Sequence, residues 1–156
     1  MEKWILTITI FLPLFGAARV YGGNPEKHKA IRNKAFGVSL LTALCAFIAV
    51  ALFFSAAGEG EGRFHLEQSA DWVTSALALG DSVDIRYHVG IDGVSLWLFA
   101  LTAFLTPLAI LGSFNGIRER AREYYALMLL LQTGMLGVFC ALDLLLFYVF
   151  FEFTLI

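Results

Sequence analysis

The sequence has 156 residues, of which 59% are hydrophobic, 15% aromatic and only 15% charged. Its mean hydropathy is +0.76, whereas soluble domains are about 45–50% apolar and about 25% charged. This composition excludes a disordered or collagen-like chain, and the formal net charge of −2 argues against a protein that binds nucleic acid. Long uncharged runs rich in Phe indicate a protein that crosses a membrane several times.

Apolar runs long enough to cross a membrane, about 20 residues each, predict four spans, at residues 4–23, 35–57, 93–117 and 124–142. A fifth run, 143–156, would reach only about 20 Å as a helix. We therefore predict an all-α polytopic membrane protein, with residues 1–156 as the front part of one longer transmembrane domain. A signal peptide, with Lys3 before an apolar stretch, is an alternative interpretation of the first run.

The charges alternate between the segments that connect these spans. The long connection 58–92 is acidic, whereas the loops 24–34 and 115–123 are basic and carry Lys27, Lys29, Arg32, Lys34, Arg118, Arg120 and Arg122. Positively charged loops remain in the cytoplasm. We therefore expect both basic loops inside, and the N-terminus and the acidic loop outside.

The acidic loop contains a strand pattern from Asp84 to Ile91, in which Ile85, Tyr87, Val89 and Ile91 share one face. A short extracytoplasmic β-hairpin over the outer helix ends would suit this pattern. Residues 72–79 are a weaker candidate for an interfacial helix or strand. Asp92 follows the strand and is a candidate N-cap for the third span.

Glu152 is the one acidic residue inside a predicted span. It lies nine residues past Asp143, which is about 13–14 Å along a helix and close to the middle of the bilayer. A charge at that depth costs at least about 2.5–3.5 kcal/mol, so such a residue normally faces protein and is paired or neutral. We expect Glu152 to transfer protons; a structural carboxyl bonded to a neighbouring helix is the alternative.

Two neighbours of Glu152 are candidates for a supporting role. Asp143 should point to the opposite face of the helix, because nine residues make two and a half turns, and it is better explained as an N-cap. Tyr148 lies one turn before Glu152 on the same face. Its hydroxyl could relay a proton, or its ring could serve only for packing.

Other polar residues within the spans suggest structural roles. Pro107 frees the carbonyl of Ala103, which a threonine hydroxyl could satisfy. In the fourth span, a short group typical of close helix packing with polar contacts comprises Gln132, Thr133, Gly134 and Gly137. Cys45 and Cys140 lie in apolar runs and are expected to pack. The histidines are widely spaced in predicted loops, so we expect no metal site; they are His28, His65 and His88.

Two segments resemble a known family. Residues 87–96, YHVGIDGVSL, followed by a long span, resemble the entry to the third helix of subunit M (chain 4) of proton-pumping NADH:quinone oxidoreductase, respiratory complex I. Residues 141–152, ALDLLLFYVFFE, are similar to the fifth helix of that family, its most specific motif. The resemblance is close over residues 84–156, and the first two spans match only in placement.

The resemblance implies the antiporter-like subunit fold, with about fourteen transmembrane helices and two inverted repeats. It implies that Glu152 is the fifth-helix glutamate, which interacts with a lysine on a later helix and transfers protons during quinone reduction elsewhere in the complex. NADH, FMN, iron–sulfur clusters and quinone would be bound by other subunits, so this chain would hold no cofactor and perform no redox chemistry. Its partners would be neighbouring antiporter-like subunits in a bacterial inner membrane.

Two other functions remain open from the sequence. One is that of the D-type subunit of a multi-subunit sodium/proton antiporter, which has no redox partner. Gly93 after Asp92 favours subunit M, although a related chloroplast-type chain is hard to separate. The other is a structural membrane subunit that moves no ions, which Glu152 argues against.

Overall fold

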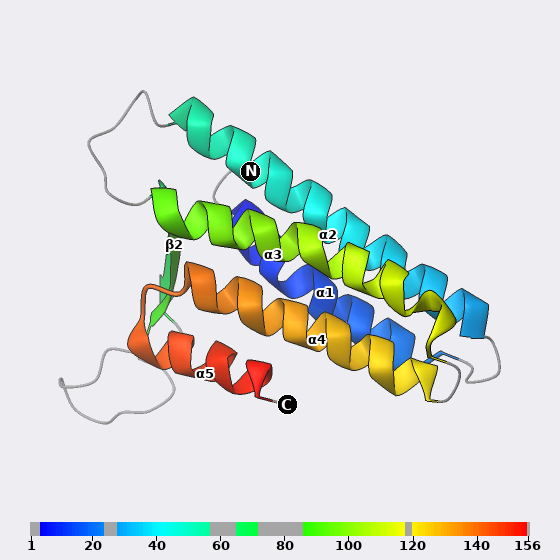
Figure 1. Cartoon of the computed structure of the whole chain (residues 1–156). Helices are drawn as coiled ribbons and strands as arrows, with labels where there is room; N and C mark the ends of the chain where they lie inside the picture. The colour runs from blue at the N-terminus through cyan, green and yellow to red at the C-terminus, as the bar shows by residue number, and fades with distance from the viewer. Residues whose placement is uncertain (1–3, 24–27, 57–64, 72–85, 118–119, 156) are drawn as a thin grey trace.

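The computed structural model describes residues 4–23, 28–56, 65–71, 86–117 and 120–155. Its helices form a bundle in which α4 contacts α1, α2, α3 and α5 (Figure 1). The elements in chain order are α1 (Ile5–Tyr21), α2 (His28–Ala56), β1 (His65–Asp71), β2 (Arg86–Ile91), α3 (Gly93–Gly112), the 3₁₀ turn η3 (Ser113–Asn115), α4 (Ala121–Cys140) and α5 (Leu144–Thr154). The architecture is mostly helical with one small sheet, as predicted.

Three helical segments of the described residues are long and apolar enough to span a membrane, at His28–Ser55, Gly93–Asn115 and Ala121–Cys140. The helix α1 has 17 residues, so it is shorter than the predicted span 4–23. The helix α2 has 29 residues and begins at His28, so residues 28–34 of the predicted basic loop are helical. This segment lacks Gly and Pro, and the helix can therefore continue beyond the apolar run.

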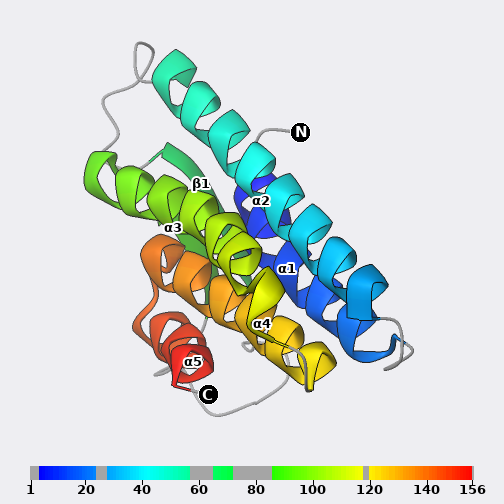
Figure 2. The ribbon, with the colours of Figure 1, turned by 45° about the vertical axis from the view of Figure 1, so that its right-hand side comes forward.

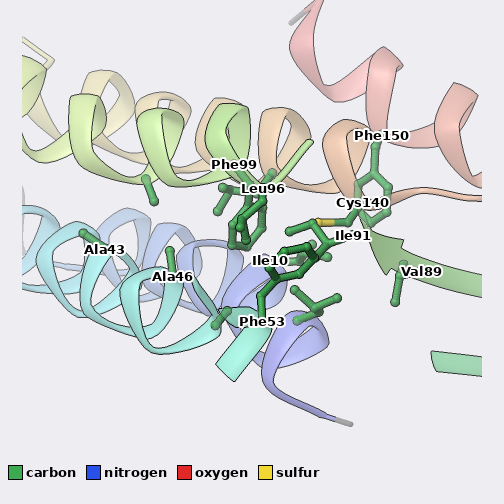
Figure 3. Close-up of a cluster of buried hydrophobic side chains, with 14 of the residues drawn as sticks. Ile10, Ala43, Ala46, Phe53, Val89, Ile91, Leu96, Phe99, Cys140 and Phe150 are labelled. Atoms are coloured by element: carbon green, nitrogen blue, oxygen red, sulfur yellow. The ribbon is translucent and has the colours of Figure 1, made fainter. Parts of the chain in front are cut away.

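The core lies where the helices meet at the end of the bundle that carries the two strands. Residues from every helix and from β2 form one buried cluster, in which Ile10, Phe99 and Cys140 come together (Figure 3). A second cluster around Tyr125 and Leu129 lies toward the opposite end. The remaining helix faces carry exposed Leu and Phe side chains, which is the pattern expected of helices in lipid.

The two strands form an antiparallel hairpin across one end of the bundle (Figures 1 and 2). Val89 and Ile91 are fully buried, which confirms the predicted inner face of the second strand. The pairing shifts register between His65 and Gln68, where Leu66 has a φ of 55°. Ile85 and residues 72–79 lie outside the described residues.

The hairpin is fixed to two helical elements. Thr7 of α1 donates a hydrogen bond of 2.6 Å to Gln68 of β1, and its hydroxyl lies 3.0 Å from that of Tyr87. The backbone N–H of Leu142, between α4 and α5, donates to the carbonyl of His88 at 2.9 Å. The hairpin therefore joins the start of α1 to the turn before α5.

Local hydrogen bonds explain how α3 begins and where its proline is tolerated. Asp92 caps α3 by accepting from the N–H groups of Val94 and Ser95, and Ser95 completes a capping box. This confirms the predicted cap. At Pro107 the sequence interpretation was only partly right: Thr106 donates to the carbonyl of Thr102 at 3.0 Å, because a threonine hydroxyl reaches the carbonyl four residues back.

Candidate functional site

The candidate site is built on α5, and Asp143 determines where this helix begins. The Asp143 carboxylate accepts hydrogen bonds from the N–H groups of Leu145 and Leu146, at 2.8 and 3.1 Å. These bonds satisfy two donors that the first helical turn leaves free. The predicted cap is confirmed, and Asp143 acts at the start of α5 and not beside Glu152.

Close packing of α5 on α4 orients the helix. A Cβ atom added at Gly137 would clash with the ring of Phe150, and one at Gly134 would lie 3.0 Å from Cβ of Phe153. The buried Phe150 ring points into the core toward Cys140, and it lies 6.2 Å from the ring of Phe11 on α1 (Figure 3). The two glycines thus let α5 approach α4, as the sequence predicted.

Glu152 and Tyr148 come together on the other face of α5. Tyr148 lies one helical turn before Glu152 on this face, close enough for its phenol to interact with the carboxylate. Both side chains are exposed, Tyr148 to 60%. The ring of Tyr148 therefore does not pack in the described core.

The face that carries this pair is otherwise apolar. Glu152 is the only charged residue within α5. The exposed large apolar residues of the helix are Leu144, Leu145, Phe147 and Phe151, and the C-cap residue Leu155 is exposed as well. A carboxylate in such a face cannot contact hydrocarbon at low cost, so this face suits contact with protein or with enclosed water.

Two polar features of the bundle are less evident from the sequence. Gln132 is fully buried in α4, and neither atom of its amide has a hydrogen-bond partner among the described residues. It therefore does not supply the expected polar contact between helices. The second feature is a groove of about 470 Å³ between α1, α4, α5 and the hairpin; the polar residues that line it are Thr7, Gln68, Tyr87 and Thr133. The Thr7 contacts join segments 61 and 80 residues apart, and no sequence pattern pointed to them.

Comparison with known proteins identifies the family. Residues 72–151, just over half of the chain, match the family model described as NADH-ubiquinone oxidoreductase chain 4, amino terminus. This segment includes β2, α3, α4 and most of α5.

Relatives from a plant, a bacterium and an alga agree with this match. The NADH-ubiquinone oxidoreductase chain 4 of Marchantia polymorpha is 32% identical over 147 residues, which cover 94% of this chain and 28% of that protein. The NADH-quinone oxidoreductase subunit M of Rickettsia prowazekii is 30% identical over 156 residues, 100% of this chain and 30% of that protein. The chain 4 of Prototheca wickerhamii is 36% identical over 155 residues, 97% of this chain and 30% of that protein.

The chain thus spans about 30% of the length of these curated relatives. The match extends over nearly all of the chain, including the first two helices, where the sequence resemblance was only one of placement. The chain belongs to the family of NADH-ubiquinone oxidoreductase chain 4, also named NADH-quinone oxidoreductase subunit M.

Proposed function

We propose that this chain is part of a proton-translocating membrane subunit of an NADH:quinone oxidoreductase, and that Glu152 transfers the proton. The observation that carries the proposal is the Glu152–Tyr148 pair, an acid and a phenol one helical turn apart on an apolar helix face. A carboxyl that gains a cationic partner is ionised, and one that loses it in an apolar environment takes up a proton. Movement of such a partner would therefore drive proton uptake and release at Glu152.

The position of Tyr148 gives it a specific role in this proposal. Its hydroxyl would donate to the ionised carboxylate and hold it in one rotamer, so that the acid faces the protein that covers α5. The antiporter-like fold, with a lysine partner on a later helix, belongs to the same proposal. The proposal places the subunit in a bacterial inner membrane. The N-terminus then lies outside, because the basic ends of the helices remain in the cytoplasm.

The proposal assigns the redox chemistry to other subunits. NADH, FMN, iron–sulfur clusters and quinone would bind elsewhere in the complex, and this chain would contribute membrane helices and a proton site. Its partners would be neighbouring antiporter-like subunits, for which the exposed apolar faces of α2, α3 and α5 offer surface.

The test is proton pumping and NADH:quinone turnover of the whole complex in membrane vesicles. Glu152→Gln keeps the volume and an acceptor for the Tyr148 hydroxyl but removes the titratable proton. We expect it to lower pumping and coupled turnover by about tenfold or more, the scale of losing a proton-transfer group, while native gels show an assembled complex. Glu152→Asp should retain part of the activity, and Tyr148→Phe should show a smaller loss.

Asp143→Asn is the matched control, because asparagine still caps the helix while the same charge is removed from the start of α5. Pumping by assembled Glu152→Gln complex at the wild-type rate and ratio would make Glu152 structural. Ion transport driven by a sodium gradient, in membranes whose NADH oxidation does not depend on this chain, would instead support the antiporter alternative.

A further inference from the structure

A second groove, here called the α1–α4 groove, lies at the opposite end of the bundle from the hairpin. It has a volume of about 600 Å³ and runs between the last turns of α1 and the first turns of α4. The apolar residues that form it include Leu14, Ala18, Tyr21, Ala126, Leu127 and Leu130. The small side chains of Ala18 and Ala126 leave space between the two helices, whereas neighbouring turns carry the larger Leu and Phe side chains.

Among the described residues, positive charges strongly outnumber negative charges at this end of the bundle. The cationic side chains near the helix ends are Arg19, Lys29, Arg32, Lys34, Arg120 and Arg122. The one described carboxylate there is Glu123, which lines the groove and is paired with Arg120 at 3.4 Å. The groove mouth therefore retains the charges of Arg19 and Arg122.

Two arginines neighbour groove-lining residues at the basic end of the groove. The guanidinium of Arg122 lies over the ring of Tyr21, 4.9 Å from its centre, and is one helical turn before the groove residue Ala126. Arg19 is one turn beyond Phe15, which also lines the groove. An apolar furrow with two cations at its polar end matches a phospholipid, whose acyl chain needs apolar surface and whose phosphate needs positive charge.

We propose that the α1–α4 groove binds an anionic phospholipid of the leaflet on the basic side of the membrane. One acyl chain lies along Ala18 and Leu127, and the headgroup phosphate lies between Arg19 and Arg122. The Tyr21 ring, which holds Arg122 by its cation–π contact, fixes the headgroup at the boundary between hydrocarbon and water. This inference rests on the proposed membrane location but not on proton transfer by Glu152.

The test uses the whole complex, reconstituted into nanodiscs of phosphatidylcholine with phosphatidylglycerol, and counts bound lipids by native mass spectrometry. Arg19→Gln/Arg122→Gln should remove one tightly bound phosphatidylglycerol, with affinity falling about fivefold for each arginine. Ala18→Phe fills the groove, leaves both arginines in place and should remove the same lipid. Lys34→Gln, a loss of charge on α2 away from the groove, should leave the count unchanged.

A photocrosslinking experiment tests the same site with both arginines in place. With Leu127→p-benzoylphenylalanine, illumination should attach phosphatidylglycerol in preference to phosphatidylcholine. Equal attachment of both lipids would show a site without headgroup selectivity and would overturn the proposal. An unchanged phosphatidylglycerol count in Arg19→Gln/Arg122→Gln, with Ala18→Phe blocking assembly, would show that a protein helix fills the groove. Proton pumping is measured separately, so neither result depends on Glu152.

Discussion

At the scale of single residues, the sequence predicted the polar residues of α5 best. Glu152 was evident because a lone acid in an apolar run needs an explanation, and Asp143 because a short acid before a helix caps it. The exposure of Tyr148 beside Glu152 shows that its ring does not pack in the described core, and its role toward the acid stays a prediction. Gln132 was recognisable only as a polar residue, since its burial without a described partner depends on how the helices pack around it.

The contact at Gly137 makes a prediction about the packing of α5. Gly137→Ala places a methyl group against the Phe150 ring, where there is no room for it, so α5 must move away from α4. We expect a destabilisation of about 1–3 kcal/mol, typical of overpacking, and thermal inactivation of the complex at a lower temperature. Phe150→Leu in the same chain should restore part of the loss.

Gly37→Ala is the matched control for that prediction. Gly37 lies in the interior of α2 with nothing within 4 Å of an added Cβ, so alanine there should be neutral or stabilising by up to about 1 kcal/mol. Equal effects of the two substitutions would mean that Gly137 is not a close contact.

At the scale of elements, long apolar runs predicted the existence of the helices, but they did not predict where each helix begins and ends. The sequence misplaces the start of α2 because a run of charges is typical of a loop, whereas a helix can extend its first turns into water. The strand β2 was predicted from its alternation, but β1 was not. Its sequence, His65–Asp71, has no β-branched residue, so its strand structure depends on pairing with β2 and on Gln68 meeting Thr7.

The attachment of the hairpin to α1 is tested by Tyr87→Phe. Thr7 gives its one hydroxyl proton to Gln68, so Tyr87 donates to Thr7. A tyrosine is protonated at neutral pH, and burial raises the pKa of Tyr87 further above its ordinary value, so this donor persists also in mildly alkaline solution. Loss of the bond should cost about 1 kcal/mol and make hydrogen exchange of the β2 amides about fivefold faster.

A double-mutant cycle with Thr7→Val provides the control for Tyr87→Phe. The two substitutions should be less than additive, because each removes the same hydrogen bond. Strict additivity would show that the two hydroxyls act independently, and the hairpin would then be held mainly by the buried Val89 and Ile91.

At the scale of the whole molecule, the two ends of the bundle differ in chemistry. One end carries the hairpin and the caps Asp92 and Asp143. The other carries the first turns of α2 and α4, with arginines and lysines on their surfaces. Because α2 and α4 both start at the basic end and α1 and α3 both end there (Figure 1), one orientation places every basic segment on the same side of the membrane.

Cysteine accessibility in membrane vesicles of known sidedness tests that orientation. Lys29 lies in the first turn of α2 and Ser69 in β1, and both are exposed. By the positive-inside rule, a membrane-impermeant maleimide should label Lys29→Cys only from the cytoplasmic side and Ser69→Cys only from the opposite side. The unsubstituted chain is the control, since its cysteines, Cys45 and Cys140, lie within α2 and α4. Labelling of Lys29→Cys from the outer side would invert the orientation and would move the proposed lipid to the other leaflet.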